Sequence, residues 1–313
     1  MKEVSNAFES GSQKDFEAQF AHREYFDVAG GEAEVVDITP EKLKDETPVL
    51  VAPAWGLNVD VYKRAIETLS EERERRVISL SHPRRGGDLK AKSSEEERKK
   101  YPQEELRKAY NILGVLEQKN IPQVDAIAHS EAGINVTIAA ILHPEKFRNI
   151  VYYAPAGLIG TDTFTNLLNR FSKQERGETL ADIPISDGEK ETGAAAKASW
   201  ISYLRANPLR AIKEAHEISQ SEIHEMIRYL HGKGIGIVVA SGIDDPVFPT
   251  HKMQKIAKLD MIDGFLSMRG GHGGIGDVPE EFMAKIEGIL SALQDQKEHA
   301  VDGVKPDLLE EFK

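Results

Sequence analysis

The sequence of 313 residues contains no cysteine. Disulfide bonds, thiolate metal sites and a cysteine nucleophile are therefore excluded together. Long apolar runs are also missing, because a run such as 234–240 has the length of a strand and is far too short to cross a bilayer. The first nine residues mix charges into the positions where a signal peptide needs an unbroken apolar stretch. We therefore expect a cytoplasmic protein.

Positive charge is scarce, with 40 Lys and Arg against 52 Asp and Glu and a formal net charge of -12. Phosphate backbones and anionic lipids repel such a protein, so we expect neither nucleic acid nor a membrane surface as partner. A small-molecule substrate is the expected partner, and the sequence leaves a homo-oligomer open. Apolar residues at 40% and charged residues at 29% predict a sizeable core under a well-solvated surface.

Short apolar runs alternate with segments of helical spacing along much of the chain. Continuous apolar strands are buried on both faces, so the alternation predicts a mostly parallel central sheet flanked by helices, an α/β fold. A hairpin is expected before it, because Gly30-Gly31 supplies the positive φ of a tight turn between 22–28 and 33–38. The predicted strands of the parallel part are 48–52, 76–80, 124–128, 150–153, 234–240 and 264–268.

The alternation lapses between about 157 and 233, and this interval divides the chain into parts. Its spacing is mostly helical, which predicts an insertion best interpreted as a lid. We expect a leader at 1–20, a core formed by 21–156 and 234–296, a helical lid at 157–233 and a peripheral tail at 297–313. Helices are predicted at 59–69, 93–118, 133–142, 163–171, 193–205, 208–218, 221–231 and from 279 onward.

The most informative segment is 124–133, which places Ser130 between a buried strand and a helix. Small residues, Ala128 and Ala132, stand two positions before and after the serine. A sharp strand-to-helix turn strains the serine backbone, and only small side chains fit beside it. The segment predicts a nucleophile at Ser130, against the simpler interpretation of a strand–helix junction with a capping serine. We expect His129 to pack or hydrogen-bond at this turn.

At this turn the chain resembles the α/β-hydrolase superfamily, the group of lipases, esterases and carbon–carbon hydrolases. The family consensus is Gly-x-Ser-x-Gly, where this chain has alanine twice and Gly133 directly afterwards. Two further segments are similar, His-Pro-Glu-Lys-Phe at 143–147 and the arginine- and glycine-rich loop at 81–87. The resemblance spans roughly 22–293 and implies a serine esterase- or lipase-like hydrolase with a lid and without a cofactor.

A serine hydroxyl is a poor nucleophile until a neighbouring base accepts its proton. Of the ten histidines, His272 differs in its setting, because four glycines surround it directly after the last predicted strand. Such a loop lets an imidazole approach another backbone closely. We therefore predict His272 as the base, against the alternative of an idle histidine in a flexible loop. No spacing of the other histidines predicts a metal site.

The orienting carboxylate is expected between serine and histidine in chain order, at the end of a strand. The segment 242–249 follows the strand 234–240 and offers two acids, Asp244 and Asp245. The family pattern places the acid three residues after the glycine, which favours Asp245. Asp244 would then be a turn or capping residue.

The oxyanion of an attacked carbonyl needs preorganised donors, each worth about 3 kcal/mol in the transition state. The amide of Glu131 stands at the start of a predicted helix, where amides lack helical partners. The second donor is expected in the loop 53–57, where family members often carry His-Gly and this chain has Pro-Ala. By position we expect the amide of Trp55, with its indole lining the acyl pocket, against the alternative of a core tryptophan.

The sequence thus predicts a serine hydrolase that cleaves a carboxylic ester of a small molecule with Ser130, His272 and Asp245. Ser130 stands where dehalogenases and epoxide hydrolases on this scaffold carry an aspartate nucleophile. Carbon–carbon bond hydrolysis, lactone opening, acyl transfer and small-peptide hydrolysis use the same residues and stay open. A hypothesis from another class is a non-catalytic binding protein, because a fold does not dictate a function.

Overall fold

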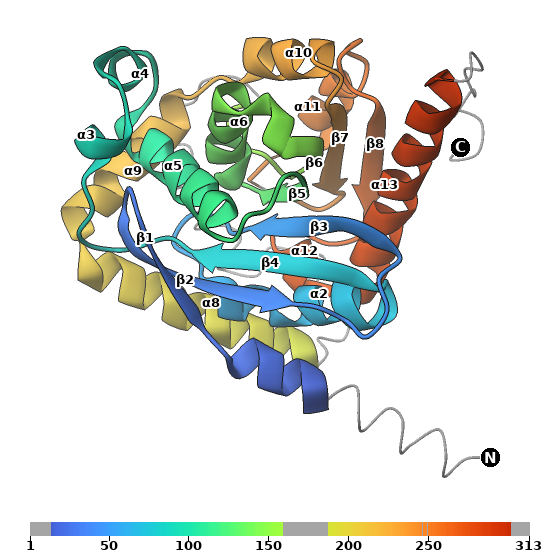
Figure 1. Cartoon of the computed structure of the whole chain (residues 1–313), viewed down its shortest axis with the longest axis horizontal. Coiled ribbons are helices and arrows are strands. Elements are labelled where there is room, and N and C mark those ends of the chain that lie inside the picture. Colours follow the sequence, from blue (N-terminus) through green and yellow to red (C-terminus); the bar gives the residue numbers. More distant parts are fainter. Residues whose placement is uncertain (1–13, 159–186, 246, 249, 302–313) are drawn as a thin grey trace.

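The computed structural model describes residues 14–158, 187–245, 247–248 and 250–301 (Figure 1). The strands are β1 (Glu24–Val28), β2 (Gly31–Ile38), β3 (Asp45–Ala52), β4 (Arg75–Ser81), β5 (Val124–His129), β6 (Phe147–Tyr153), β7 (Gly236–Gly242) and β8 (Gly264–Met268). The helices of the first half are η1 (Val59–Tyr62), α2 (Lys63–Glu67), η2 (Thr68–Glu72), α3 (Leu89–Lys92), α4 (Glu95–Lys100), α5 (Gln103–Gln118), α6 (Ala132–Leu142) and η3 (Pro144–Lys146). Those of the second half are α8 (Asp187–Ala206), α9 (Pro208–Gln220), α10 (His224–Gly232), α11 (Thr250–Ile256), α12 (Gly274–Asp277) and α13 (Pro279–Val301).

One eight-stranded sheet has the order β1-β2-β4-β3-β5-β6-β7-β8. The strands from β3 to β8 pair in parallel, and only β1 and β2 run antiparallel to their neighbours. Every residue of the central strand β5 is buried, as expected for a strand covered on both faces. The predicted α/β fold with a mostly parallel central sheet is confirmed.

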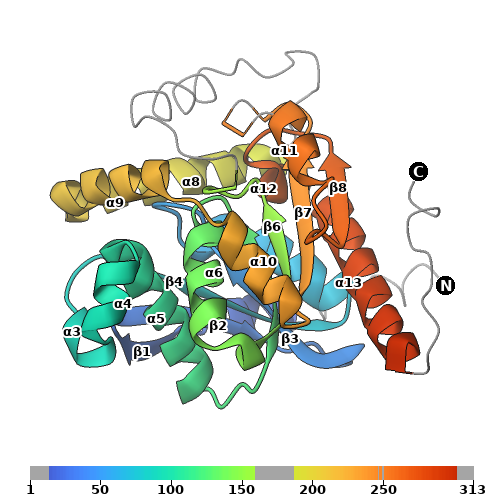
Figure 2. The same cartoon turned by 90° about the horizontal axis from the view of Figure 1, so that it is seen from above.

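Helices cover both faces of the sheet (Figures 1 and 2). The helices α5, α6 and α10 pack together on one face, and α2, η2, α12 and α13 pack on the other. The helices α8 and α9 pass over the end at which the parallel strands finish (Figure 2). Since the carboxyl ends of parallel strands meet at one edge, this edge collects the loops that the sequence singled out.

The opening hairpin is confirmed, with β1 and β2 paired from Glu24 and Val35 to Val28 and Gly31. Gly31 has φ 116°, so the second glycine of the pair supplies the positive φ of the turn. Two helix predictions were too simple. The segment 59–72 is built from three short helical pieces, and 93–118 is interrupted at Tyr101 and Pro102. A proline disfavours the helical conformation of the residue before it, which separates α4 from α5.

The structure contains helices in two intervals outside the predicted core, the predicted leader and the predicted lid. Residues 14–21 form a helix whose Phe16 and Phe20 are buried in the core. In the predicted lid, α8, α9 and α10 contain the expected helices 193–205, 208–218 and most of 221–231. The helix expected at 163–171 lies outside the described residues, and the boundaries of leader, core, lid and tail stay predictions. No helix in the described part of the chain has the length and apolarity needed to span a membrane.

A buried ion cluster closes the amino end of the parallel strands. The guanidinium of Arg75, 1% exposed, bonds Asp125 at 2.8 Å and Glu287 at 2.7 Å. Arg148 bonds Asp125 and Asp45, both at 2.5 Å. Each carboxylate therefore meets at least one guanidinium, which offsets the desolvation of these charges. We call these five residues the amino-end cluster.

Candidate active site

Ser130 stands on a strained turn between β5 and α6. Its φ is 55°, a left-handed conformation that is uncommon for a residue with a side chain. Backbone bonds hold the turn: the amide of Ser130 donates to Tyr153 O at 2.9 Å, and its carbonyl accepts from Ala156 N at 2.9 Å. A side chain at position 133 would place its Cβ 2.8 Å from that of Pro155. The glycine that this turn requires is thus Gly133, while Ala128 and Ala132 are accommodated.

The structure brings together the three side chains that the sequence singled out. The Nε2 atom of His272 lies 2.9 Å from Ser130 Oγ. The Nδ1 atom of the same ring lies 3.0 Å from Asp245 Oδ2. All three residues are buried, with at most 5% of their surface exposed. A hydroxyl, an imidazole and a carboxylate therefore form one hydrogen-bonded relay.

The loop after β7 fixes the carboxylate of this relay. The Oδ1 atom of Asp245 accepts from the amides of Val247 and Phe248, at 2.7 and 2.9 Å. Its Oδ2 atom is thereby turned toward His272. Asp244 is half-exposed, and its amide donates to Gly270 O at 3.1 Å. Of the two acids that the sequence offered, Asp245 is the one that touches the imidazole.

Glycines allow the histidine loop to lie directly on the loop of the acid. A Cβ at position 242 would lie 2.4 Å from Gly270 O and 2.6 Å from Gly271 O. Gly270 itself has φ 108°. The two backbones approach more closely than side chains permit, which explains glycine on both sides of the contact.

A second chain of hydrogen bonds ties the histidine to the loop after β3. Because the carbonyl of His272 can only accept, the Nε2 atom of His129, 2.9 Å away, must donate to it. The Nδ1 atom of His129 then accepts from Tyr62 OH at 2.7 Å. The same phenol oxygen accepts from the amide of Ala54 at 2.8 Å. Burial, together with the nearby His272, lowers the pKa of His129 to about 3, so His129 is neutral.

The two predicted oxyanion donors lie on neighbouring loops. Glu131 is the N-cap of α6, where the amide has no helical acceptor. Trp55 is 6% exposed, and its indole Nε1 donates to Tyr203 OH at 3.2 Å and Glu214 Oε2 at 3.1 Å. The indole is thus held by two side chains of the helices α8 and α9. The oxyanion role of both backbone amides stays a prediction.

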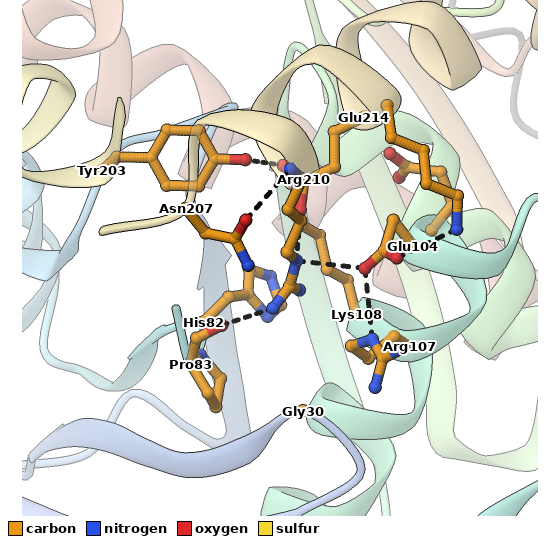
Figure 3. Close-up of polar contacts among 12 residues, drawn as sticks. Gly30, His82, Pro83, Glu104, Arg107, Lys108, Tyr203, Asn207, Arg210 and Glu214 are labelled. Atoms are coloured by element: carbon orange, nitrogen blue, oxygen red, sulfur yellow. Dashed lines mark hydrogen bonds and ion pairs between the residues drawn. The ribbon is translucent and has the colours of Figure 1, made fainter. Parts of the chain in front are cut away.

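Beside the loop that carries Trp55 lies a second buried group of charges, shown in part in Figure 3. The ammonium of Lys108 on α5 lies 2.5 Å from Glu131 Oε1 and 3.1 Å from Glu214 Oε2. Arg210 Nε lies 2.9 Å from Glu214 Oε1. We call Lys108, Glu131, Arg210 and Glu214 the carboxyl-end cluster.

Burial and charge act against each other in the carboxyl-end cluster. Burial lowers the pKa of Lys108, but Glu131, Glu214 and Glu105 outweigh it and raise the pKa overall. Burial raises the pKa of Glu214 to about 7, although Lys108 opposes this change. Burial and the charge of Glu131 raise the pKa of Glu105 well above its usual value.

The carboxyl-end cluster borders a pocket with an empty volume of about 360 Å³, including its open mouth. The lining comes from the loop after β3, the end of β4 with the loop that follows, the turn after β5, and the helices α5, α8 and α9. Its residues are Ala54, Gly56, Leu57, Asn58, Ser81, His82, Pro83, Arg84, Lys108, Glu131, Tyr203, Arg210 and Glu214. Trp55, expected to line the acyl pocket, does not line this one and lies behind Glu214 and Tyr203.

Comparisons with known proteins agree with this architecture. A sequence profile described as alpha/beta hydrolase fold matches residues 47–194. Among curated protein sequences, none matches this chain. Solved structures do match, over most of the chain.

Three of these structures show the range of similar proteins. A thermophilic esterase from Thermogutta terrifontis is 16% identical with a TM-score of 0.61, covering 87% of this chain and 99% of that chain. The enol-lactonase from Burkholderia xenovorans LB400 is 14% identical with a TM-score of 0.60, covering 86% and 100%. The meta-cleavage product hydrolase from Pseudomonas fluorescens IP01 is 16% identical with a TM-score of 0.57, covering 86% and 97%. At such low identities the similarity establishes the fold alone.

Proposed function

Because this chain belongs to the α/β-hydrolase superfamily, we propose that it is a serine hydrolase that cleaves carboxylic esters of small molecules. The observation that carries the proposal is the relay from Ser130 Oγ through His272 to Asp245, with distances of 2.9 and 3.0 Å. Esterases among the structural relatives support the same reaction class.

Each group of the relay has one role in the proposed mechanism. His272 Nε2 takes the proton of Ser130 as the serine oxygen attacks the ester carbonyl. Asp245 keeps the imidazole in the tautomer that accepts at Nε2 and stabilises the imidazolium that forms. The negative oxygen rests on the amides of Trp55 and Glu131. His272 then protonates the leaving alcohol, and water repeats the sequence on the acyl-enzyme.

A panel of para-nitrophenyl esters of increasing chain length tests this proposal. We expect turnover by the wild type, and Ser130→Ala should lower kcat by about 10⁴-fold or more while the melting temperature stays near that of the wild type. A lactone belongs in the panel, because an enol-lactonase is among the structural relatives and lactone opening needs the same relay. Near wild-type turnover by Ser130→Ala would refute the mechanism.

A further inference from the structure

The pocket beside the proposed oxyanion loop has an unusual wall for an esterase. Small-molecule pockets are lined mainly by apolar and aromatic side chains with a few polar groups. Here three cations, Arg84, Lys108 and Arg210, and two carboxylates, Glu131 and Glu214, line the pocket. An alkyl chain placed there would lie against these charges without offering them a hydrogen-bond partner. The lining therefore fits a polar group of the substrate.

The carboxylates of this wall already have hydrogen-bond donors from the protein. Glu214 Oε1 accepts from Arg210 Nε. Glu214 Oε2 accepts from Lys108 at 3.1 Å, from the indole of Trp55 at 3.1 Å and from Tyr203 OH. Glu131 Oε1 accepts from the same lysine. A cationic or donor-rich ligand would have to displace these partners.

The donors of the wall are less well matched. Within the described part of the chain, the guanidinium of Arg84 forms no ion pair and bonds only the hydroxyls of Ser199 and Ser202. Lys108 and Arg210, by contrast, each face carboxylates. Arg84 is thus the cation whose charge the described protein leaves uncompensated.

His82 adds a neutral donor to the same wall. Asn111 Oδ1 accepts from the amide of Gly30 at 2.7 Å, so its Nδ2 atom is the one that faces His82 Nδ1 at 3.3 Å. Because the amide nitrogen donates, His82 Nδ1 accepts and the ring proton is on Nε2. This Nε2 atom is buried and has no partner among the described residues. Burial and the charges of Lys108 and Arg210 lower the pKa of His82, which keeps the ring neutral.

We infer that this pocket binds an anionic oxygen group of the substrate, and that the preferred ester carries a carboxylate on its acyl chain. The inference rests on the proposed ester hydrolysis. Arg84 supplies the unmatched positive charge, and His82 is the buried donor that lacks an acceptor. We place the carboxylate on the acyl part of the ester because the pocket adjoins the proposed oxyanion loop. Tyr203 and Glu214, which hold the indole of Trp55, are part of the pocket wall.

Two para-nitrophenyl esters of matched length test the inference. One is the hexanoate, and the other is the half-ester of adipic acid, in which a carboxylate replaces the terminal methyl group. We expect kcat/KM for the half-ester to exceed that for the hexanoate by about tenfold or more, since charge-assisted hydrogen bonds are the stronger ones. Equal values, or a preference for the hexanoate, would overturn the inference.

Variants of two adjacent arginines separate the pocket from general charge. Arg84→Gln should reduce the preference for the half-ester by about tenfold, and Arg84→Lys should retain part of it. Arg85→Gln removes the same charge from an exposed neighbour that does not line the pocket, and it should leave the preference unchanged. An equal loss in both glutamine variants would contradict a specific role for Arg84.

Binding to Ser130→Ala tests the pocket independently of turnover. Isothermal titration calorimetry should show tighter binding of the half-ester than of the hexanoate, and this difference should shrink when Arg84→Gln is added. If the wild type cleaves neither ester but the binding difference remains, the proposed reaction fails and the pocket assignment stands. If the hexanoate is cleaved and no binding difference is found, the reaction stands and the pocket assignment fails.

Discussion

Two buried ion clusters lie at opposite ends of the same parallel strands, and they differ in the elements that they join. The amino-end cluster joins Arg75 and Arg148 to three carboxylates from β3, β5 and α13. The carboxyl-end cluster joins Lys108 and Arg210 to Glu131 and Glu214 beside a pocket. The first ties strands to a helix of the core, and the second ties the turn of the serine to α5 and α9.

The two clusters illustrate two roles of buried charges, one in the stability of the fold and one in the candidate active site. Buried pairs recover their desolvation only with good geometry and further hydrogen bonds. At the amino end the guanidinium groups meet their carboxylates directly. At the carboxyl end the pocket is open and the pKa of Glu214 is raised to about 7 by burial. We therefore expect changes at the amino end to affect folding, and changes at the carboxyl end to affect activity.

The largest contrast is expected from the same substitution at the two ends. Asp245→Asn should lower kcat by about 10⁴-fold, because the amide no longer holds the imidazole in the required tautomer. Asp125→Asn should keep kcat and lower the free energy of unfolding by about 3 kcal/mol, because Arg75 and Arg148 lose a buried counter-charge. Steady-state kinetics and urea denaturation measure the two effects.

The matched control for the acid is Asp244→Asn, which changes a half-exposed neighbour. It should retain kcat within a few-fold of the wild type. A greater loss of activity in Asp244→Asn than in Asp245→Asn would show that the wrong carboxylate has been assigned.

The second contrast removes one cation from each cluster. Arg75→Met and Lys108→Met should each lower the free energy of unfolding by about 3–5 kcal/mol, because each removes a buried counter-charge from two carboxylates. Only Lys108→Met should also lower kcat/KM, by about tenfold or more, because Glu131 follows the nucleophile directly. Activity is compared at a temperature where both variants are folded. Equal specific activities would remove the distinction between the clusters.

The smallest effect concerns pH and the neutral His129. Its pKa is about 3 in the folded protein against 6.5 in the unfolded chain, so below pH 6.5 the unfolded state binds the extra proton. The stability it contributes is present above pH 6.5 and is lost as the pH falls, by roughly 1.4 kcal/mol per pH unit. His129→Gln should show a shallower loss on acidification in urea denaturation. The other buried histidine, His82, is present in both the wild type and the variant and contributes equally to both. An identical dependence of the free energy of unfolding on pH in the two proteins would therefore contradict a buried neutral His129.

Much of the fold was predictable because it depends on local patterns. Apolar runs marked all six parallel strands, and Gly30-Gly31 marked the hairpin. The same patterns failed where proline decided the outcome, since Pro102 divides a stretch whose apolar spacing fits one helix. For the predicted leader the sequence offers a frayed segment or a loose helix, and the structure has a helix at 14–21 with two buried phenylalanines.

The candidate site was predictable only where the backbone constrains the sequence. The turn at Ser130 and the loop around His272 are recognisable in the sequence by their small residues, because larger side chains do not fit there. The carboxyl-end cluster has no such signature in the sequence. Lys108 lies in a highly charged helix, so its position predicts a solvated side chain, although the residue is buried. The bond from Tyr62 to His129 joins residues 67 positions apart, and nothing in the sequence pairs these two residues. Such contacts follow from tertiary packing and have no local signature.

The most direct test of the account is covalent labelling with a fluorophosphonate probe, followed by mass spectrometry of the peptides. We predict a single adduct on Ser130, lost in Ser130→Ala and strongly slowed in a variant that lacks the imidazole of His272. A correctly folded wild type that takes up no probe, or takes it up at another serine, would contradict Ser130 as the nucleophile and favour a non-catalytic binding protein.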